Sequence, residues 1–131
     1  MNAEIIHDSV VATVAGTKTF PEVVRTMLAE GVESYHADLV RMEKTFYTPD
    51  GKTQIEKLPV PERAIAQEFS GAGVMDALRI TQAGKCTYQE FLNNVMGAGT
   101  TGYIVYLNGK RAIYFGRKGE FHVEEFPRAN P

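Results

Sequence analysis

His36 and Asp38 are the pair of residues in this sequence whose types and spacing could support chemistry. They lie two positions apart in a segment with strand-like alternation, so both side chains should project from the same face. A histidine beside a carboxylate is a common arrangement in general-base and metal sites. We expect Tyr47, Gln54 and Glu56 to share this face, with His122 as a further contributor to a small-molecule site. The alternative is an ordinary solvent-exposed strand with polar side chains.

Other chemical signatures are absent from the sequence. The three histidines are scattered, with no HxxxH or CxxC spacing, so we expect no metal site. No glycine-rich nucleotide loop and no G-x-S-x-G motif occurs, and we expect no cofactor. Cys86 is the single cysteine, which rules out an intrachain disulfide. These absences favour a binding module, and the alternative is a small-molecule pocket or a modest enzyme centred on His36 and Asp38.

Four segments have the apolar spacing of amphipathic helices. Thr19 to Glu22 and Thr87 to Glu90 are capping boxes, in which the threonine and glutamate satisfy each other's backbone amides at a helix start. Gly31 and Gly99 stand where a helix end requires positive φ. We expect helices at residues 3–14, 20–30, 72–82 and 88–98.

Between and after the helices, the hydrophobic period changes to two, which predicts strands. The expected strands are residues 34–39, 44–48, 52–58, 103–107, 110–115 and 120–126. Asn108-Gly109 is typical of a type I′ hairpin turn, which would place Val105 opposite Ala112.

Residues 2–59 align without a gap with residues 70–127, and residues 60–69 connect the two segments. We interpret this as an internal duplication of a helix, helix, three-stranded meander unit. The predicted fold is therefore a single α+β domain over residues 1–131, with about four helices and six antiparallel strands. Whether the two meanders merge into one sheet is left open. Function is expected where the two units differ.

One such difference concerns the outer faces of the meanders. By the hairpin register, the second meander carries apolar residues there: Ile104, Tyr106, Ile113 and Phe115. The first meander carries His36 and Asp38 at corresponding positions. An exposed apolar patch signals a partner, and we expect a homodimer formed through these four residues. The alternatives are an unidentified protein or small molecule, or a patch covered within the chain.

Composition sets the class of protein. The chain has 131 residues, 44% hydrophobic and 23% charged, which are the proportions of one soluble globular domain. A net charge of −2 gives no general attraction to nucleic acid. No apolar run approaches the roughly 20 residues of a membrane helix, and the first residues lack a signal-peptide pattern. We expect a cytoplasmic protein without nucleic-acid or membrane partners.

Several sequence runs resemble the YbcV-like family. They are Phe20-Pro-Glu-Val-Val, Gly31-Val-Glu-Ser-Tyr35-His36-Ala-Asp38-Leu, Thr87-Tyr-Gln-Glu-Phe-Leu and Tyr114-Phe-Gly. This family comprises small bacterial and prophage-encoded proteins of unknown function, some labelled as phage envelope proteins. The resemblance covers nearly the whole chain and implies the same fold unit and a link to prophages. It carries no family active site that could be transferred to residues of this chain.

Overall fold

The structure is a computed structural model that describes residues 1–126. Its helices are α1 (Ala3–Ala15), α2 (Phe20–Ala29), α3 (Gly71–Gln82) and α4 (Tyr88–Gly97). Its strands are β1 (Ser34–Asp38), β2 (Glu43–Tyr47), β3 (Thr53–Lys57), β4 (Gly102–Tyr106), β5 (Arg111–Phe115) and β6 (Phe121–Glu125). The expected α+β class, with four helices and six antiparallel strands, is confirmed.

All six strands form one sheet in the order β3-β2-β1-β4-β5-β6. The two meanders merge because β1 pairs antiparallel with β4, with His36 opposite Ile104 at the centre of the pairing. This answers the question that the sequence left open. Each half has the same order of elements, but the internal duplication itself stays a prediction, as does the single-domain assignment. Pro127, the last residue of the second predicted unit, lies outside the described residues.

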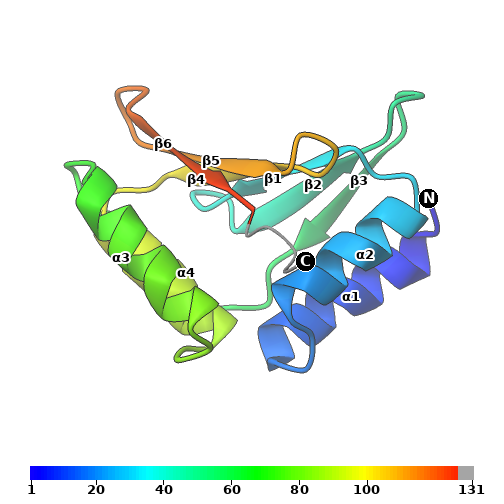
Figure 1. The fold of residues 1–131 in the computed structure, drawn as a ribbon, viewed down its shortest axis with the longest axis horizontal. Coiled ribbons are helices and arrows are strands. Elements are labelled where there is room, and N and C mark those ends of the chain that lie inside the picture. Colours follow the sequence, from blue (N-terminus) through cyan, green and yellow to red (C-terminus); the bar gives the residue numbers. More distant parts are fainter. Residues whose placement is uncertain (127–131) are drawn as a thin grey trace, which may run out of the picture.

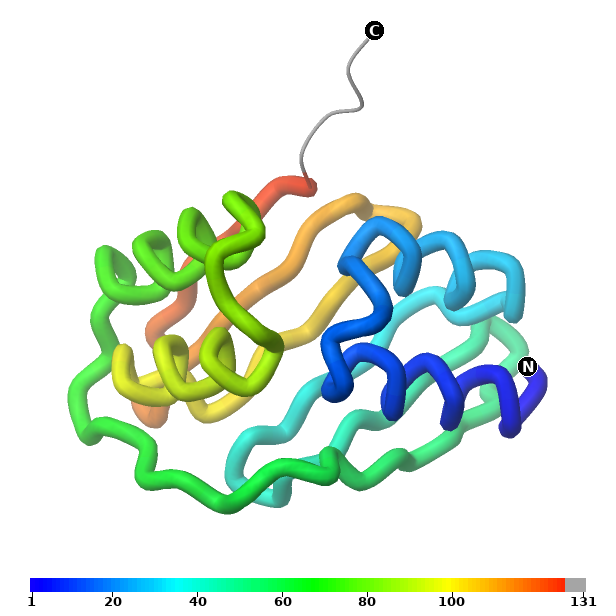
Figure 2. Tube along the Cα trace, turned by 90° about the horizontal axis from the view of Figure 1, so that it is seen from below, coloured from blue at the N-terminus to red at the C-terminus, as the bar shows by residue number. Residues whose placement is uncertain are grey.

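The four helices lie on the same face of the sheet (Figure 1). Viewed from the helix side, α1 and α2 form one pair and α3 and α4 form another beside it (Figure 2). The first pair reaches β3 through α1, and the second reaches β6 through α3. The core lies between helices and sheet, and its largest enclosed side chains include Ile6, Met27, Phe46, Leu92 and Met96. No helix within residues 1–126 has the length and apolar character needed to cross a membrane.

The predicted capping boxes and helix-ending glycines have the expected geometry. Both capping boxes form: the Thr19 and Thr87 side chains each accept the amide of the glutamate three residues later, and that glutamate accepts the cap amide. Gly31 has φ 78° and Gly99 has φ 85°, so both predicted helix ends are confirmed.

The predicted type I′ turn at Asn108-Gly109 is wrong, although the register derived from it is correct. Positive φ occurs at Lys110 instead, at 54°. Leu107 is buried, and its amide donates to the Glu33 carbonyl oxygen at 3.0 Å. Since Leu107 is held in this way, the ladder between β4 and β5 ends one residue earlier, and residues 107–110 form a four-residue loop.

Candidate functional site

The helices cover one face of the sheet (Figure 1), and the strand register and burial put most of the residues singled out from the sequence on the other face. The strand pairings align its side chains in three rows across the sheet. From β3 to β6, the middle row is Ile55, Thr45, His36, Ile104, Ile113 and Val123. One flanking row is Thr53, Tyr47, Ser34, Tyr106, Arg111 and Glu125. The other flanking row is Lys57, Glu43, Asp38, Gly102, Phe115 and Phe121. We call these residues the open face.

Several large hydrophobic side chains of the open face are in contact with solvent. Phe121 is 67% exposed and Ile55 60%, and Tyr47, Tyr106 and Val123 are also exposed. The remaining interface candidates, Ile104, Ile113 and Phe115, are half-buried between their neighbours. All four predicted interface residues therefore share one face, as the hairpin register required. That a partner covers these four residues stays a prediction.

His36 sits near the centre of the open face in an aromatic environment. Its ring packs against Phe115, with ring centroids 5.7 Å apart. Gly102 permits this contact, because a Cβ at that position would approach the Phe115 ring to 3.1 Å. The Phe115 ring thus lies over β4, and apolar surface rather than a carboxylate lies against the imidazole.

Asp38 is engaged with the backbone of its own turn. Its Oδ1 atom accepts hydrogen bonds from the amides of Val40 and Arg41, each at 3.0 Å. This is the Asx-type contact by which aspartate stabilises a turn. The geometry therefore gives Asp38 a structural role at the end of β1. A chemical role beside His36 stays a prediction.

Two candidates lie on the helix-covered side. The prediction that Gln54 and Glu56 share the face of His36 is wrong, because they lie opposite the buried Phe46 and Lys44 of β2. The Glu56 carboxylate instead contacts His7 Nδ1 at 2.6 Å. His122 lies opposite the buried Tyr114, also on the helix side. The structure thus puts His36, Asp38 and Tyr47 on one face of the sheet and Glu56 and His122 on the other.

Apart from Asp38, the charged side chains of the open face form ion pairs at its two ends. The Glu43 carboxylate lies 2.9 Å from Arg41 Nε and 3.2 Å from Lys57 Nζ. At the other end, Arg111 Nη2 lies 3.1 Å from Glu125 Oε1. These pairs leave the middle row free of acidic and basic residues other than His36.

Lys44 is a chemically unusual residue that sequence reasoning missed. It is 4% exposed on the helix side of β2, and its Nζ lies 4.6 Å from the ring centroid of Tyr88 and 5.3 Å from that of Tyr35. Burial lowers the pKa of the Lys44 amine to about 7. One signal was present: Lys44 alternates in phase with the buried Phe46, and Ala112 stands at the corresponding position of the second predicted unit.

The aromatic residues around Lys44 form a connected cluster. The Tyr88 and Tyr103 hydroxyls are 2.7 Å apart and hydrogen-bonded, and Tyr103 packs against Tyr114 with ring centroids at 5.0 Å. Burial raises the pKa of Tyr35, Tyr103 and Tyr114 well above that of an ordinary tyrosine, so these hydroxyls stay protonated. The cluster joins β1 and β2 of the first half to α4, β4 and β5 of the second.

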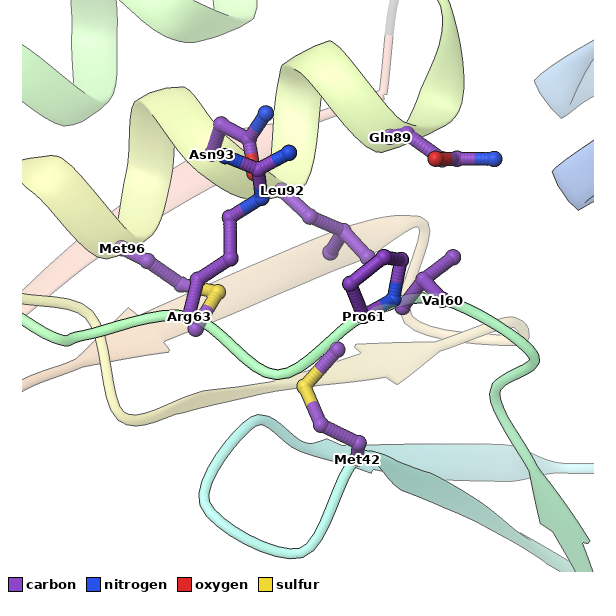
Figure 3. Close-up of a pocket in the computed structure, with 8 residues that line it drawn as sticks. All are labelled: Met42, Val60, Pro61, Arg63, Gln89, Leu92, Asn93 and Met96. Atoms are coloured by element: carbon purple, nitrogen blue, oxygen red, sulfur yellow. The ribbon is translucent and has the colours of Figure 1, made fainter.

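Two hollows lie beside the connector, residues 60–69. One is a slot of about 10 Å³ between the connector and α4, with Met42 below Pro61 and Arg63 reaching toward Asn93 (Figure 3). The other is a groove of about 210 Å³ lined by Leu39, Val40, Met42, Glu62, Arg63, Ile65 and Arg117. Neither hollow includes a candidate residue from the sequence analysis. Within residues 1–126, no group of three or more histidine, cysteine, aspartate or glutamate side chains is placed to hold a metal ion.

Comparisons with known proteins give a family description but no activity. A family model described as a protein of unknown function (DUF1398) matches residues 52–125, more than half of the chain. Uncharacterised proteins from Mycobacterium bovis and from Mycobacterium tuberculosis are 26% identical over 113 residues, covering 86% of this chain and 69% of theirs. Neither comparison mentions phage, so the YbcV-like and prophage resemblance is not confirmed.

Proposed function

Because the chain belongs to the DUF1398 family of proteins of unknown function, we propose its role from its own geometry: a homodimeric binding module that self-associates through the open face. A single observation carries the proposal. One side of the sheet is covered by all four helices, while the other presents apolar residues along a middle row. Contiguous exposed apolar surface of this kind marks interaction sites in folded proteins.

The distribution of charge supports an interface on this face. Protein interfaces have charge-depleted centres and polar rims. The middle row contains isoleucine, valine, threonine and histidine, whereas the ion pairs of Glu43 and Arg111 lie at the two ends. Because these charges are neutralised within one copy, an approaching surface does not have to supply counter-charges for them.

The size of the face suits a dimer. Six strands at about 4.8 Å spacing and five residues at about 3.3 Å rise give a planar footprint of roughly 29 by 17 Å. Two copies would bury roughly 1,000 Å² of planar area, and more once the relief of the side chains is counted. Specific interfaces start at about this size.

A second copy of this chain is the occupant that the face fits best. In a two-fold dimer each copy presents the same patch, so an uncharged apolar row meets an identical row. A net charge of −2 per copy adds little repulsion. A strongly acidic or basic partner would instead meet a middle row with no fixed charge to attract it.

The test is the molar mass in solution, measured by light scattering over a range of concentrations. We expect wild type to be a dimer and Tyr106→Glu to be a folded monomer, because the interface would have to bury a third charge beside Arg111, which already pairs with Glu125. Ile80→Glu is the matched control: Ile80 is 41% exposed on α3, close to the 38% of Tyr106, but lies outside the open face. It should remain dimeric.

A monomeric wild type at all concentrations would refute the proposal. So would a Tyr106→Glu variant that keeps the mass of wild type. Equal loss of the dimer in Ile80→Glu would place the interface on the helices instead.

A further inference from the structure

The larger hollow beside the connector lies between three segments that are distant in the sequence. Its walls come from the turn between β1 and β2, from the connector and from the turn between β5 and β6. We call the residues that line it the connector groove: Leu39, Val40, Met42, Glu62, Arg63, Ile65 and Arg117. None of them belongs to the open face.

Part of this groove is apolar. Leu39 and Met42 are buried at its base, with 2% and 6% of their surface exposed. Val40 is 64% exposed beside them, and Ile65 of the connector is half-buried. A compact apolar group placed here would remove the Val40 side chain from water, which is favourable in proportion to the area covered.

Two arginines, Arg63 and Arg117, line the same groove, and Arg63 also lines the slot beside α4. Arg117 Nη2 donates to the Ile65 carbonyl oxygen at 3.0 Å, which holds the Arg117 side chain against the connector. Its remaining N–H groups stay available, since a guanidinium has five. Among the described residues, neither Arg63 nor Arg117 has a carboxylate within 4 Å, whereas nearby Arg41 and Lys118 are paired.

We propose that the connector groove binds a small organic carboxylate, with its apolar body against Val40 and its carboxylate at Arg63 and Arg117. Guanidinium groups recognise carboxylates through paired, charge-assisted hydrogen bonds. The groove lining holds two cations against one carboxylate, that of Glu62, so a monoanion balances it. Of the neighbouring cations, Arg41 pairs with Glu43 and Lys118 with Glu68, whereas Arg63 and Arg117 have no such partner among the described residues.

Benzoate is a suitable probe because it joins one carboxylate to a compact apolar ring. In an amide chemical-shift titration, millimolar benzoate should shift the signals of residues 39–42 and 62–65 in a saturable manner. Benzyl alcohol has the same ring without the charge and should bind at least about tenfold more weakly.

Arg63→Gln and Arg117→Gln should each weaken benzoate binding by about tenfold, the effect of losing a charge-assisted hydrogen bond. Arg79→Gln is the matched control, because Arg79 pairs with Asp76 at 3.8 Å on the surface of α3. It should bind like wild type. Within residues 1–126, the Arg63 side chain makes no hydrogen bond that Arg63→Gln would remove, and the amide spectrum of the variant reports directly whether it is folded.

The proposal is overturned if wild type shows no saturable shifts, if benzyl alcohol binds as well as benzoate, or if both glutamine variants keep wild-type affinity. Tighter binding of phenyl phosphate than of benzoate would replace the carboxylate by a phosphate as the preferred group and would also overturn it. Tyr106→Glu should bind benzoate like wild type, so the outcome is separate from that of the dimer experiment.

Discussion

At the scale of single residues, Lys44 combines two opposing effects. Burial on the inner face of β2 removes its amine from water and favours the neutral form. The faces of Tyr35 and Tyr88 attract the charged form, an interaction of about 1–2 kcal/mol for a desolvated pair. Burial lowers the pKa of the Lys44 amine to about 7, so the desolvated ammonium is disfavoured relative to the unfolded chain. Lys44 therefore lowers the free energy of unfolding at neutral pH.

Replacing this lysine should stabilise the protein in a pH-dependent way. Between the folded pKa of about 7 and the unfolded value of about 10.4, the unfolded chain binds one more proton, so the free energy of unfolding of wild type rises with pH in this window. The full penalty is present below the folded pKa, where the amine is charged in both states. Lys44→Met should raise the free energy of unfolding by about 1–3 kcal/mol at pH 7, with a gain that shrinks toward pH 10.

Urea unfolding at several pH values measures this difference. Lys52→Met is the control, because the Lys52 side chain is 65% exposed and its change should alter stability little at any pH. A Lys44→Met variant less stable than wild type at pH 7 would mean that the contacts of the ammonium outweigh its desolvation.

At the scale of the elements, the ends of α2 and α4 have the same backbone conformation but different surroundings. Gly31 and Gly99 both have positive φ, yet no atom lies within 4 Å of a Cβ built at Gly31. A Cβ at Gly99 would overlap the Glu68 carbonyl oxygen of the connector. The end of α4 thus also fixes the path of the connector, which the end of α2 does not.

We predict unequal costs for alanine at these two positions. Gly31→Ala should cost about 1–2 kcal/mol, the penalty of a left-handed residue with a side chain. Gly99→Ala should cost clearly more, because the connector must move as well. Denaturant unfolding of both variants gives the comparison, with Gly97→Ala as a control inside α4, where alanine should be neutral or stabilising. Equal costs at Gly31 and Gly99 would show that the connector moves aside freely.

At the scale of the whole molecule, the pairing of β1 with β4 makes one sheet and one core out of two halves. The tyrosine cluster around Lys44 crosses the same boundary, and α1 contacts α4. Because each half would lose a central strand partner on separation, we expect the chain to unfold as a single cooperative unit.

Hydrogen exchange in a destabilised variant tests this expectation. Ile6 of α1 is fully buried, and Ile6→Ala should lower the free energy of unfolding by about 2–5 kcal/mol. The amides of β5, in the other half, should lose as much protection as those of β2. Val11 of α1 is 46% exposed, so Val11→Ala should change neither the free energy of unfolding nor the protection of the β2 and β5 amides. Loss of protection confined to the first half would show that the halves open independently.

The sequence by itself determined the features that depend on a few neighbouring residues. Capping boxes at Thr19 and Thr87 and positive φ at Gly31 and Gly99 follow from local backbone sterics and hydrogen bonding, and all four are observed. The period-two alternation also placed Tyr106 and its three fellow interface candidates on one face, because alternation is a property of the strand itself.

Only the tertiary structure decided what depends on contacts between distant segments. The merger of the meanders, the side of the sheet that the helices cover and the burial of Lys44 all follow from strand pairing and packing across the chain. The placement of Glu56 away from His36 is set by the register between β2 and β3, and the shape of the loop after Leu107 by the bond to Glu33. Such contacts join residues that local propensity cannot relate, since their free energy depends on which surfaces meet when the core forms.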